Sequence, residues 1–185
     1  MARTNKTVPL GSGRCYVAEF TAESMPAAAD LVALCKDENL LGETINGGTF
    51  SYSAEKHEEK DDHGVLMRID TIEETAKLGL GVFSWCNDTL TKLISTARVE
   101  ADGQYQVLKI GGLDKDNGKL YTVIFKHDDK KNGNLYIALV GTNTADISLA
   151  FAKDSTTKLS PEFTAQPSDA EGTLAYMFED LPSAG

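Results

Sequence analysis

Apolar and polar residues alternate over many short stretches of the chain, and residues that favour turns separate these stretches. Alternation with a period of two is typical of strands that bury one face, and many such segments in succession indicate an all-β sandwich or barrel. After a first strand at 14–20, we expect strands near 104–110, 119–127, 134–140, 145–152, 159–165 and 172–179. Turn-rich connections between them favour hairpins joined in a meander.

Alternating apolar residues in these strands could line a ligand cavity or fill the space between two layers. Filling that space is the commoner use. We therefore interpret the following positions as core: Tyr105, Val107, Tyr121, Val123, Phe125, Ile147, Leu149 and Phe151.

The longest expected strand runs from Val65 to Trp85. After a change of phase near Asp70, one of its faces carries Ile72, Ala76, Leu78, Leu80 and Val82. Gly79 and Gly81 fall on the opposite face, where the missing side chains leave room for the close approach of another backbone.

A turn signal, Asn46-Gly47-Gly48, precedes the alternating pair Phe50 and Tyr52. The stretch 55–62 follows, with five acids and two lysines in eight residues, and so cannot be core. It is either a solvated loop or an extended hairpin. His57 and His63 lie among acids that can bind a divalent metal, namely Glu58, Glu59, Asp61 and Asp62. No spacing within this stretch matches a metal motif, so we favour a solvated surface over a metal site.

One segment has a clear helical period. Asn87 or Asp88 can begin a helix at about 87–97, because Leu90, Leu93, Ile94 and Ala97 then share one face. A shorter helix is expected near 25–37, with Ser24 as its cap and Pro26 in its first turn, and an irregular loop is the alternative there.

The length of 185 residues favours one domain, which we place at 13–185 after a flexible N-terminal arm at 1–12. The 18 basic and 28 acidic residues give a net charge of −10, which argues against sequence-specific nucleic-acid binding and against an anionic membrane surface. No apolar stretch has the length of a signal peptide core or a membrane span, so we expect a soluble, unprocessed product.

The residues with reactive side chains do not form a recognisable catalytic motif. Cys15, Cys35 and Cys86 have no CxxC spacing and are interpreted as small buried hydrophobes made in a reducing compartment. The three histidines are placed in polar loops. Asp114–Gly118 departs from a calcium loop, and nucleotide and hydrolase motifs are missing. We therefore expect no enzyme activity, no catalytic residues and no cofactor.

The order of several short motifs resembles the major tail (tail tube) proteins of long-tailed bacteriophages and prophages. The resemblance covers about 14–181. It depends on Asn39-Leu-Leu-Gly42, on Asn46-Gly-Gly-Thr-Phe-Ser-Tyr52 with the acidic stretch after it, on Phe83-Ser-Trp85, on Asp88-Thr-Leu-Thr-Lys-Leu93, and above all on Phe163-Thr-Ala-Gln-Pro-Ser-Asp-Ala-Glu-Gly-Thr-Leu174.

The resemblance implies a β-sandwich or half-open barrel with a flanking helix, assembled as hexameric rings that stack into the tube for genome ejection. It implies a packing helix carrying Asp88, Leu90, Leu93 and Ile94, an inter-subunit extension at 46–64, and an arm at 1–12 that polymerisation orders. The implied location is the virion tail, after synthesis in the host cytoplasm. The implied partners are identical subunits and the tape-measure, tail terminator and tail-tip or baseplate proteins. The ring-interface residues we expect are Asn46, Gly47, Gly48, Phe50, Tyr52, Glu58, Glu59, Asp61, Asp62, Gly79 and Gly81.

Two physical arguments fit this reading. Unpaired strand edges, which a solitary β protein must protect, can serve a ring as interfaces. An acidic lumen would repel DNA weakly and let it pass without specific binding, although plain solubility also explains the charge. The alternatives are a monomeric β-sandwich that binds a ligand or mediates adhesion, and a metal enzyme centred on His57 and His63.

Overall fold

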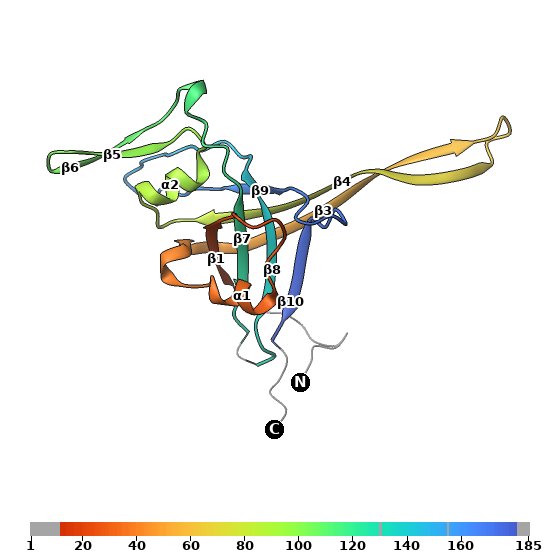
Figure 1. Cartoon of the computed structure of the whole chain (residues 1–185), viewed down its shortest axis with the longest axis horizontal. Coiled ribbons are helices and arrows are strands. Elements are labelled where there is room, and N and C mark those ends of the chain that lie inside the picture. Colours follow the sequence, from red (N-terminus) through yellow and green to blue (C-terminus); the bar gives the residue numbers. More distant parts are fainter. Residues whose placement is uncertain (1–11, 130, 155, 181–185) are drawn as a thin grey trace.

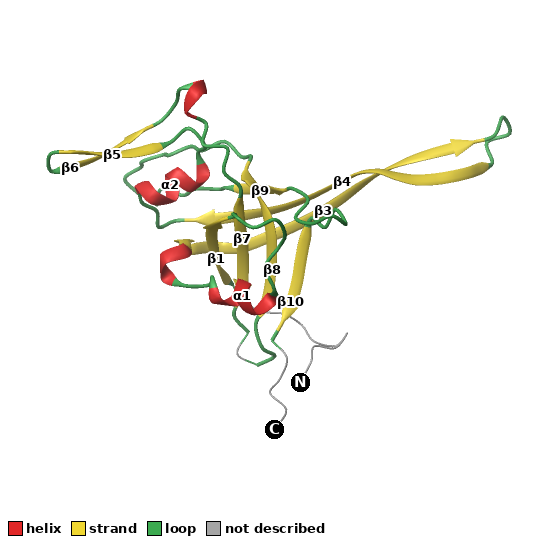
Figure 2. Cartoon of the chain, in the orientation of Figure 1, coloured by secondary structure: helices red, strands yellow, loops and turns green. Residues whose placement is uncertain are grey.

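The computed structural model describes residues 12–129, 131–154 and 156–180, and β-strands dominate them (Figures 1 and 2). This confirms the expected mainly β class. The strands are β1 (Gly13–Glu19), β2 (Leu40–Gly42), β3 (Thr44–Lys60), β4 (Leu66–Val82), β5 (Arg98–Asp102), β6 (Tyr105–Lys109), β7 (Tyr121–His127), β8 (Leu135–Asn143), β9 (Glu162–Ala165) and β10 (Ala175–Glu179). The helices are α1 (Ala28–Ala33) and α2 (Asn87–Leu93), with 3-10 turns η1 (Asp37–Asn39) and η2 (Leu113–Lys115). The flexible N-terminal segment expected at 1–12 lies outside the described residues, apart from Ser12.

Eight antiparallel strands form one sheet in the order β2-β1-β7-β8-β9-β4-β3, and β10 also pairs with β8. The expected meander is wrong, because β1 pairs with β7 along its whole length and β9 joins β8 to β4. Alternation along a strand shows which face is buried but does not show which strand is its neighbour. The nine-residue β8 is long enough to hold β10 beside its first half and β9 beside its last residues.

The sheet bends on itself into a half-open barrel. Figure 1 shows one group of antiparallel strands with a common axis: β1, β7, β8 and β10. The β3 and β4 strands cross this group, and β9 lies at the corner between the two groups. The space between these two groups holds the larger core, which α2 closes on one side: Cys15, Val17, Leu41, Leu78, Leu80, Val82, Leu90, Leu93, Tyr121, Val123, Phe125, Leu139, Leu159 and Phe163. The expected sandwich or half-barrel is confirmed.

The opposite face of β1, β7 and β8 is also covered. Residues 20–40, including α1, pack on it around Tyr16, Met25, Leu31, Ile124, Tyr136, Ala138 and Val140. Both faces of β7 are therefore buried, which explains the consecutive apolar residues Val123, Ile124 and Phe125 in its centre.

Both expected helices exist, and both are shorter than expected. The α2 helix ends at Leu93 instead of continuing to 97, and Ile94 is already extended. The Asn143 side chain donates to the Leu93 carbonyl oxygen at 3.1 Å, which satisfies a group that the helix end leaves free. The N-cap is Cys86 rather than Asn87 or Asp88. The α1 helix covers only 28–33, and its N-cap is Ala27 rather than Ser24.

Several core and strand predictions are wrong. Residues 145–151 form no strand, whereas β5 was not expected and pairs with β6 in a second, two-stranded sheet. Tyr105 and Phe151, which we assigned to the core, are 77% and 76% exposed. Ile72 is also exposed, because the part of β4 that carries it lies beyond the core.

Candidate functional site

The most unusual feature of the molecule is an arm formed by β3 and β4. Both strands have 17 residues, and they continue past the barrel as a two-stranded hairpin (Figure 1). Their pairing extends from Thr44↔Val82 to Lys60↔Leu66. The acidic stretch 55–62 is therefore an extended hairpin rather than a loop. Residues 53–60 alone span about 25 Å, at roughly 3.3 Å per residue.

The tip of the arm is a defined turn. The Asp61 carboxylate accepts the backbone N–H groups of His63 at 3.0 Å and of Val65 at 2.7 Å. The Asp61 backbone N–H in turn donates to the Val65 carbonyl oxygen at 2.9 Å. These bonds fix the end of the hairpin without any contact to the barrel.

The two strands of the arm differ in chemistry. On β3, residues 55–60 are charged apart from His57 and lie exposed. On the returning strand and at the residue just before it, five large apolar side chains are 45–70% exposed; we call them the arm patch: Val65, Leu66, Met67, Ile69 and Ile72. An exposed group of apolar side chains on one element marks an interaction surface more often than a scattered set does. The acids of this arm are among the interface residues predicted from the sequence, whereas the apolar patch is not, although five of the eight residues at 65–72 are apolar.

Ion pairs on the arm join residues two positions apart on one strand. Lys60 lies 3.3 Å from Glu58, and Arg68 pairs with Asp70. These side chains are about half exposed or more, so each pair contributes at most about 1 kcal/mol. Seven acids and three bases leave residues 55–73 with a net charge of −4.

The expected turn at Asn46-Gly47-Gly48 is a bulge inside β3. The register passes from Thr44↔Val82 to Gly48↔Leu80, and Asn46 and Gly47 have φ angles of 65° and 72°. A Cβ on Gly48 would lie 2.9 Å from the Phe125 ring, so the bulge sits against the core.

The glycines of β4 behave differently from one another. A Cβ on Gly81 would clash with the Ile45 carbonyl oxygen, which confirms the close backbone approach expected there. A Cβ on Gly79 would meet nothing nearer than the Thr49 carbonyl oxygen at 3.9 Å, so that part of the expectation is wrong.

The interface residues expected from the sequence do not form one cluster. Phe50 packs against the core, whereas Tyr52 at the root of the arm is exposed and donates a hydrogen bond to Glu74, which raises the pKa of Tyr52. The acids near the tip lie about 20–30 Å beyond Tyr52, at roughly 3.3 Å per residue. The structure thus spreads these residues over both strands of the β3–β4 hairpin and its tip turn.

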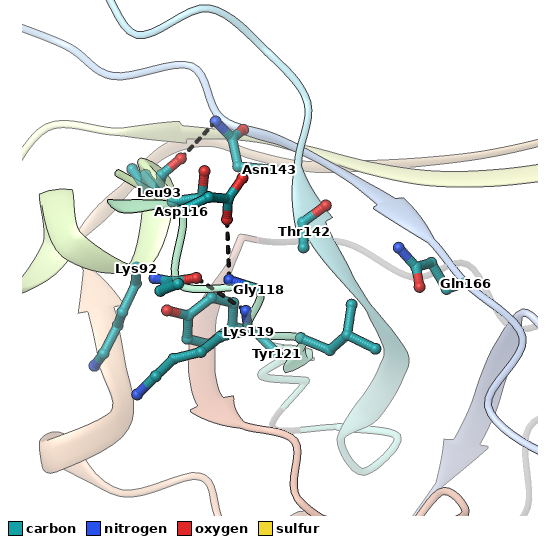
Figure 3. Close-up of a pocket in the computed structure, with 12 residues that line it drawn as sticks. Lys92, Leu93, Asp116, Gly118, Lys119, Tyr121, Thr142, Asn143 and Gln166 are labelled. Carbon is teal, nitrogen blue, oxygen red and sulfur yellow. Dashed lines mark hydrogen bonds between the residues drawn. The ribbon is translucent and has the colours of Figure 1, made fainter. Parts of the chain in front are cut away.

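Figure 3 shows a pocket of about 300 Å³ between the end of α2, the 116–121 segment and β8. Its two lysines are ion-paired, Lys92 with Asp88 at 3.1 Å and Lys119 with Glu19 at 2.6 Å. The Asp116 carboxylate accepts the Gly118 N–H at 2.9 Å and so shapes the loop itself. These charged groups of the pocket are therefore already paired within the chain.

A second cavity, of about 400 Å³, lies at the root of the arm. Its lining is mainly apolar: Phe50, Tyr52, Glu74, Ala76, Gly172, Thr173, Leu174, Ala175 and Met177. The turn beside it is held by Asp169, whose carboxylate accepts the Thr173 N–H at 2.9 Å and the Tyr176 hydroxyl at 2.6 Å. These hydrogen bonds, the Tyr176 bond first, lower the pKa of Asp169.

The cysteines and one histidine differ from expectation. Cys15 is buried, but Cys35 is only partly buried and Cys86 is exposed, so the buried interpretation is wrong for Cys86. His127 lies in β7 instead of a polar loop and is 7% exposed. Within the described parts of the chain, no three His, Cys, Asp or Glu side chains are grouped as a metal site would require. The helices seen there are also too short and polar to cross a bilayer.

Comparison with known protein families finds no family model that matches this chain, and comparison with curated proteins finds no match. The function is therefore inferred from the residues and geometry of the chain itself.

Proposed function

We propose that this chain is a structural subunit of a phage-type tail tube. In this role it assembles into hexameric rings, and the rings stack into the conduit through which DNA is ejected. The observation that carries the proposal is the arm, a long hairpin that leaves the barrel and exposes a row of apolar side chains (Figure 1). The proposal includes no catalytic step and no cofactor.

An arm of this kind is costly for a solitary protein. A two-stranded hairpin without a packed face is marginally stable in water. Covering the five side chains of the arm patch would contribute roughly 1–2 kcal/mol each, at about 25 cal/mol per Å². The favourable term appears only when another surface covers the patch, which supports a role in assembly.

Unpaired strand edges support lateral contacts within a ring. Among the residues that the structure describes, β2, β3 and β10 each pair with one strand of the sheet, so each offers its other edge. Such edges attract further strands unless they are protected. On β3 the charged residues at 55–60 discourage non-specific pairing, whereas β10 carries a single charged residue at its end, Glu179. The edge of β10 is the better candidate for pairing with a neighbour.

The acidic surface supports passage of DNA without binding. Residues 161–180 hold five acids and no base, and the arm adds a net charge of −4. Duplex DNA carries about one negative charge per 1.7 Å, so acids near a lumen would keep it from adhering, and screening over about 8 Å would confine the effect to the wall. A lumen lined by lysine and arginine would contradict this part of the proposal.

The partners we propose follow from the family resemblance. They are identical subunits along the tube, the tape-measure protein inside it, the terminator at one end and tail-tip or baseplate proteins at the other. The location is the virion tail, after synthesis in the host cytoplasm.

Electron microscopy of the pure protein tests the proposal. Concentrated wild-type protein should form rings or tubes in negative stain. A variant with residues 54–74 replaced by Asn-Gly, which joins the paired residues Ser53 and Thr75 by a tight turn, should fold but form no tubes. The control is Val32→Thr, an exposed change on α1 away from the arm, which should assemble as wild type does.

Wild-type protein that stays monomeric at high concentration would contradict the proposal. It would favour the monomeric ligand-binding or adhesion module, for which the apolar cavity at the root of the arm is the natural binding site. Tubes formed by the armless variant would show that the arm is not needed.

A further inference from the structure

The exposed apolar side chains gather at two opposite ends of the molecule. Thirteen large hydrophobic side chains are exposed among the described residues, and five of them form the arm patch. Five others lie on segments at the other end of the long axis; we call them the end patch: Phe83, Tyr105, Ile110, Leu113 and Phe151. Figure 1 shows the arm on one side and the β5–β6 hairpin, with η2 and the start of α2, on the other.

Segments far apart in the sequence meet at the end patch. The Trp85 and Phe151 rings are 6.4 Å apart, which brings the segment before α2 to the 145–158 segment. The Asn87 side chain donates to Gln106 at 3.2 Å, which brings β6 to the start of α2. The Arg98 guanidinium donates to the Gly111 carbonyl oxygen at 3.0 Å, which ties the segment before η2 to the same end.

The arm of one molecule cannot cover its own end patch. The tip turn is closed by Asp61, and the β3–β4 ladder is continuous from the tip to the barrel apart from bulges. Folding back would break this ladder along the arm. Two complementary apolar surfaces at opposite ends therefore suit contact between different copies, in a head-to-tail arrangement.

Two apolar surfaces could receive an arm, the end patch and the cavity at the root of the arm, and charge favours the end patch. The cavity at the root of the arm borders residues 161–180, whose net charge is −5, and an arm of charge −4 would be repelled there. At the opposite end, residues 98–119 carry four bases and four acids, and residues 145–160 carry two of each. That end is neutral, so it is where an acidic arm meets the least repulsion.

We propose that the arm patch of one copy docks on the end patch of another copy of this chain. The inference rests on the proposed tube function and names the receiving surface for the arm. Met67 and the isoleucines of one copy would pack against Tyr105 and Phe151 of the next, and methionine contacts aromatic rings favourably.

The available area suits one interface of ordinary size. With five side chains each, the arm patch and the end patch both offer about 500 Å² of apolar surface, taking roughly 100 Å² for each partly exposed side chain. A standard interface buries about 1,600 Å² in total, of which about 57% is apolar, or roughly 900 Å². The two patches together match that apolar share.

Three variants, two of them double, test the contact. The arm variant is Met67→Thr with Ile69→Thr, in which threonine preserves the strand propensity. The end variant is Tyr105→Thr with Phe151→Thr. The control is Val32→Thr alone, an exposed apolar residue on α1 that lies outside both patches and outside the strand edges proposed to pair within a ring. Sedimentation velocity gives the mass of the assemblies, and far-ultraviolet circular dichroism confirms folding.

The arm variant and the end variant should each weaken growth of the assembly by roughly 100-fold, from two lost apolar contacts, whereas the control should not. At a concentration where neither the arm variant nor the end variant assembles alone, an equimolar mixture of the two should form pairs, with one copy of each variant, and nothing longer. The intact arm of the end variant can dock on the intact end of the arm variant, but no free complementary surface then remains.

Each other outcome would overturn the inference in a distinct way. Loss of growth in the arm variant alone would place the receiving surface elsewhere while leaving the tube function standing. Failure of the mixture to pair would show that the two patches do not meet. Wild-type protein that never assembles would reject the tube function and this contact together.

Discussion

Two phenylalanines of this chain allow stability and assembly to be separated. Phe163 is fully buried at the corner where β9 pairs with both β8 and β4, whereas Phe151 is 76% exposed in the end patch. The same substitution, to alanine, therefore removes a core side chain in one variant and a surface side chain in the other.

Phe163→Ala should lower the free energy of unfolding by about 3–5 kcal/mol, because it leaves a cavity in a core that cannot fully collapse. Phe163 faces Leu78 across the ladder and also pairs with Asn143, so its loss weakens both sides of the bend. At about 2–4 °C per kcal/mol for a chain of this size, the melting temperature should fall by roughly 6–20 °C. Phe151→Ala should change the free energy of unfolding by less than about 0.5 kcal/mol.

The assay is urea denaturation at a protein concentration below that of assembly, followed by sedimentation of each variant at high concentration. Phe151→Ala should remain as stable as wild type and assemble less. A loss of under 1 kcal/mol for Phe163→Ala would refute the proposed core, and a loss of several kcal/mol for Phe151→Ala would show that this ring supports the fold instead of an interface.

Three further predictions concern local features. Gly81→Ala should lower the free energy of unfolding by about 1–3 kcal/mol, since its Cβ would clash with the Ile45 backbone, whereas Gly79→Ala should cost less than about 1 kcal/mol; urea denaturation distinguishes them, and equal effects would contradict the close approach. Asp169→Asn should destabilise the protein at neutral pH, but because the folded-state pKa of Asp169 is lowered, the difference from wild type should shrink as pH falls below about 4; a difference independent of pH would mean that the carboxylate charge is not involved. The pKa of Cys86 is lowered by hydrogen bonds with Thr89, so mass spectrometry should find it alkylated in the native protein, whereas Cys15, whose pKa burial raises, should react only after unfolding.

Self-assembly would explain why the chain combines a closed core with an open surface. The barrel buries its own apolar residues on both faces of β7. The arm and the end patch leave theirs exposed. A subunit that is stable before assembly remains folded at low concentration and can then add to the end of a growing assembly through surfaces that are already formed.

Local periodicity was enough to predict the strands that bury one face. Ala76, Leu78, Leu80 and Val82 were assigned to one face and are all buried. The mainly β class and the existence of α2 follow from the same local periodicity. Periodicity depends on which side chains share a face, and that relation is present in the chain before any tertiary contact forms.

Strand pairing, the ends of the elements and the exposure of some apolar residues depend on contacts between distant parts of the chain. Ile72 shares the pattern of the core residues of β4, yet it is exposed because the hairpin has already left the barrel at that point. The end of α2 depends on Asn143, a residue fifty positions away. The sequence of 55–62 is compatible with a loop and with a hairpin, because its charged side chains are solvated in both. The hairpin forms because residues 55–60 pair with β4. The arm patch has the same composition as a core strand, and what distinguishes it is the distance from the rest of the protein.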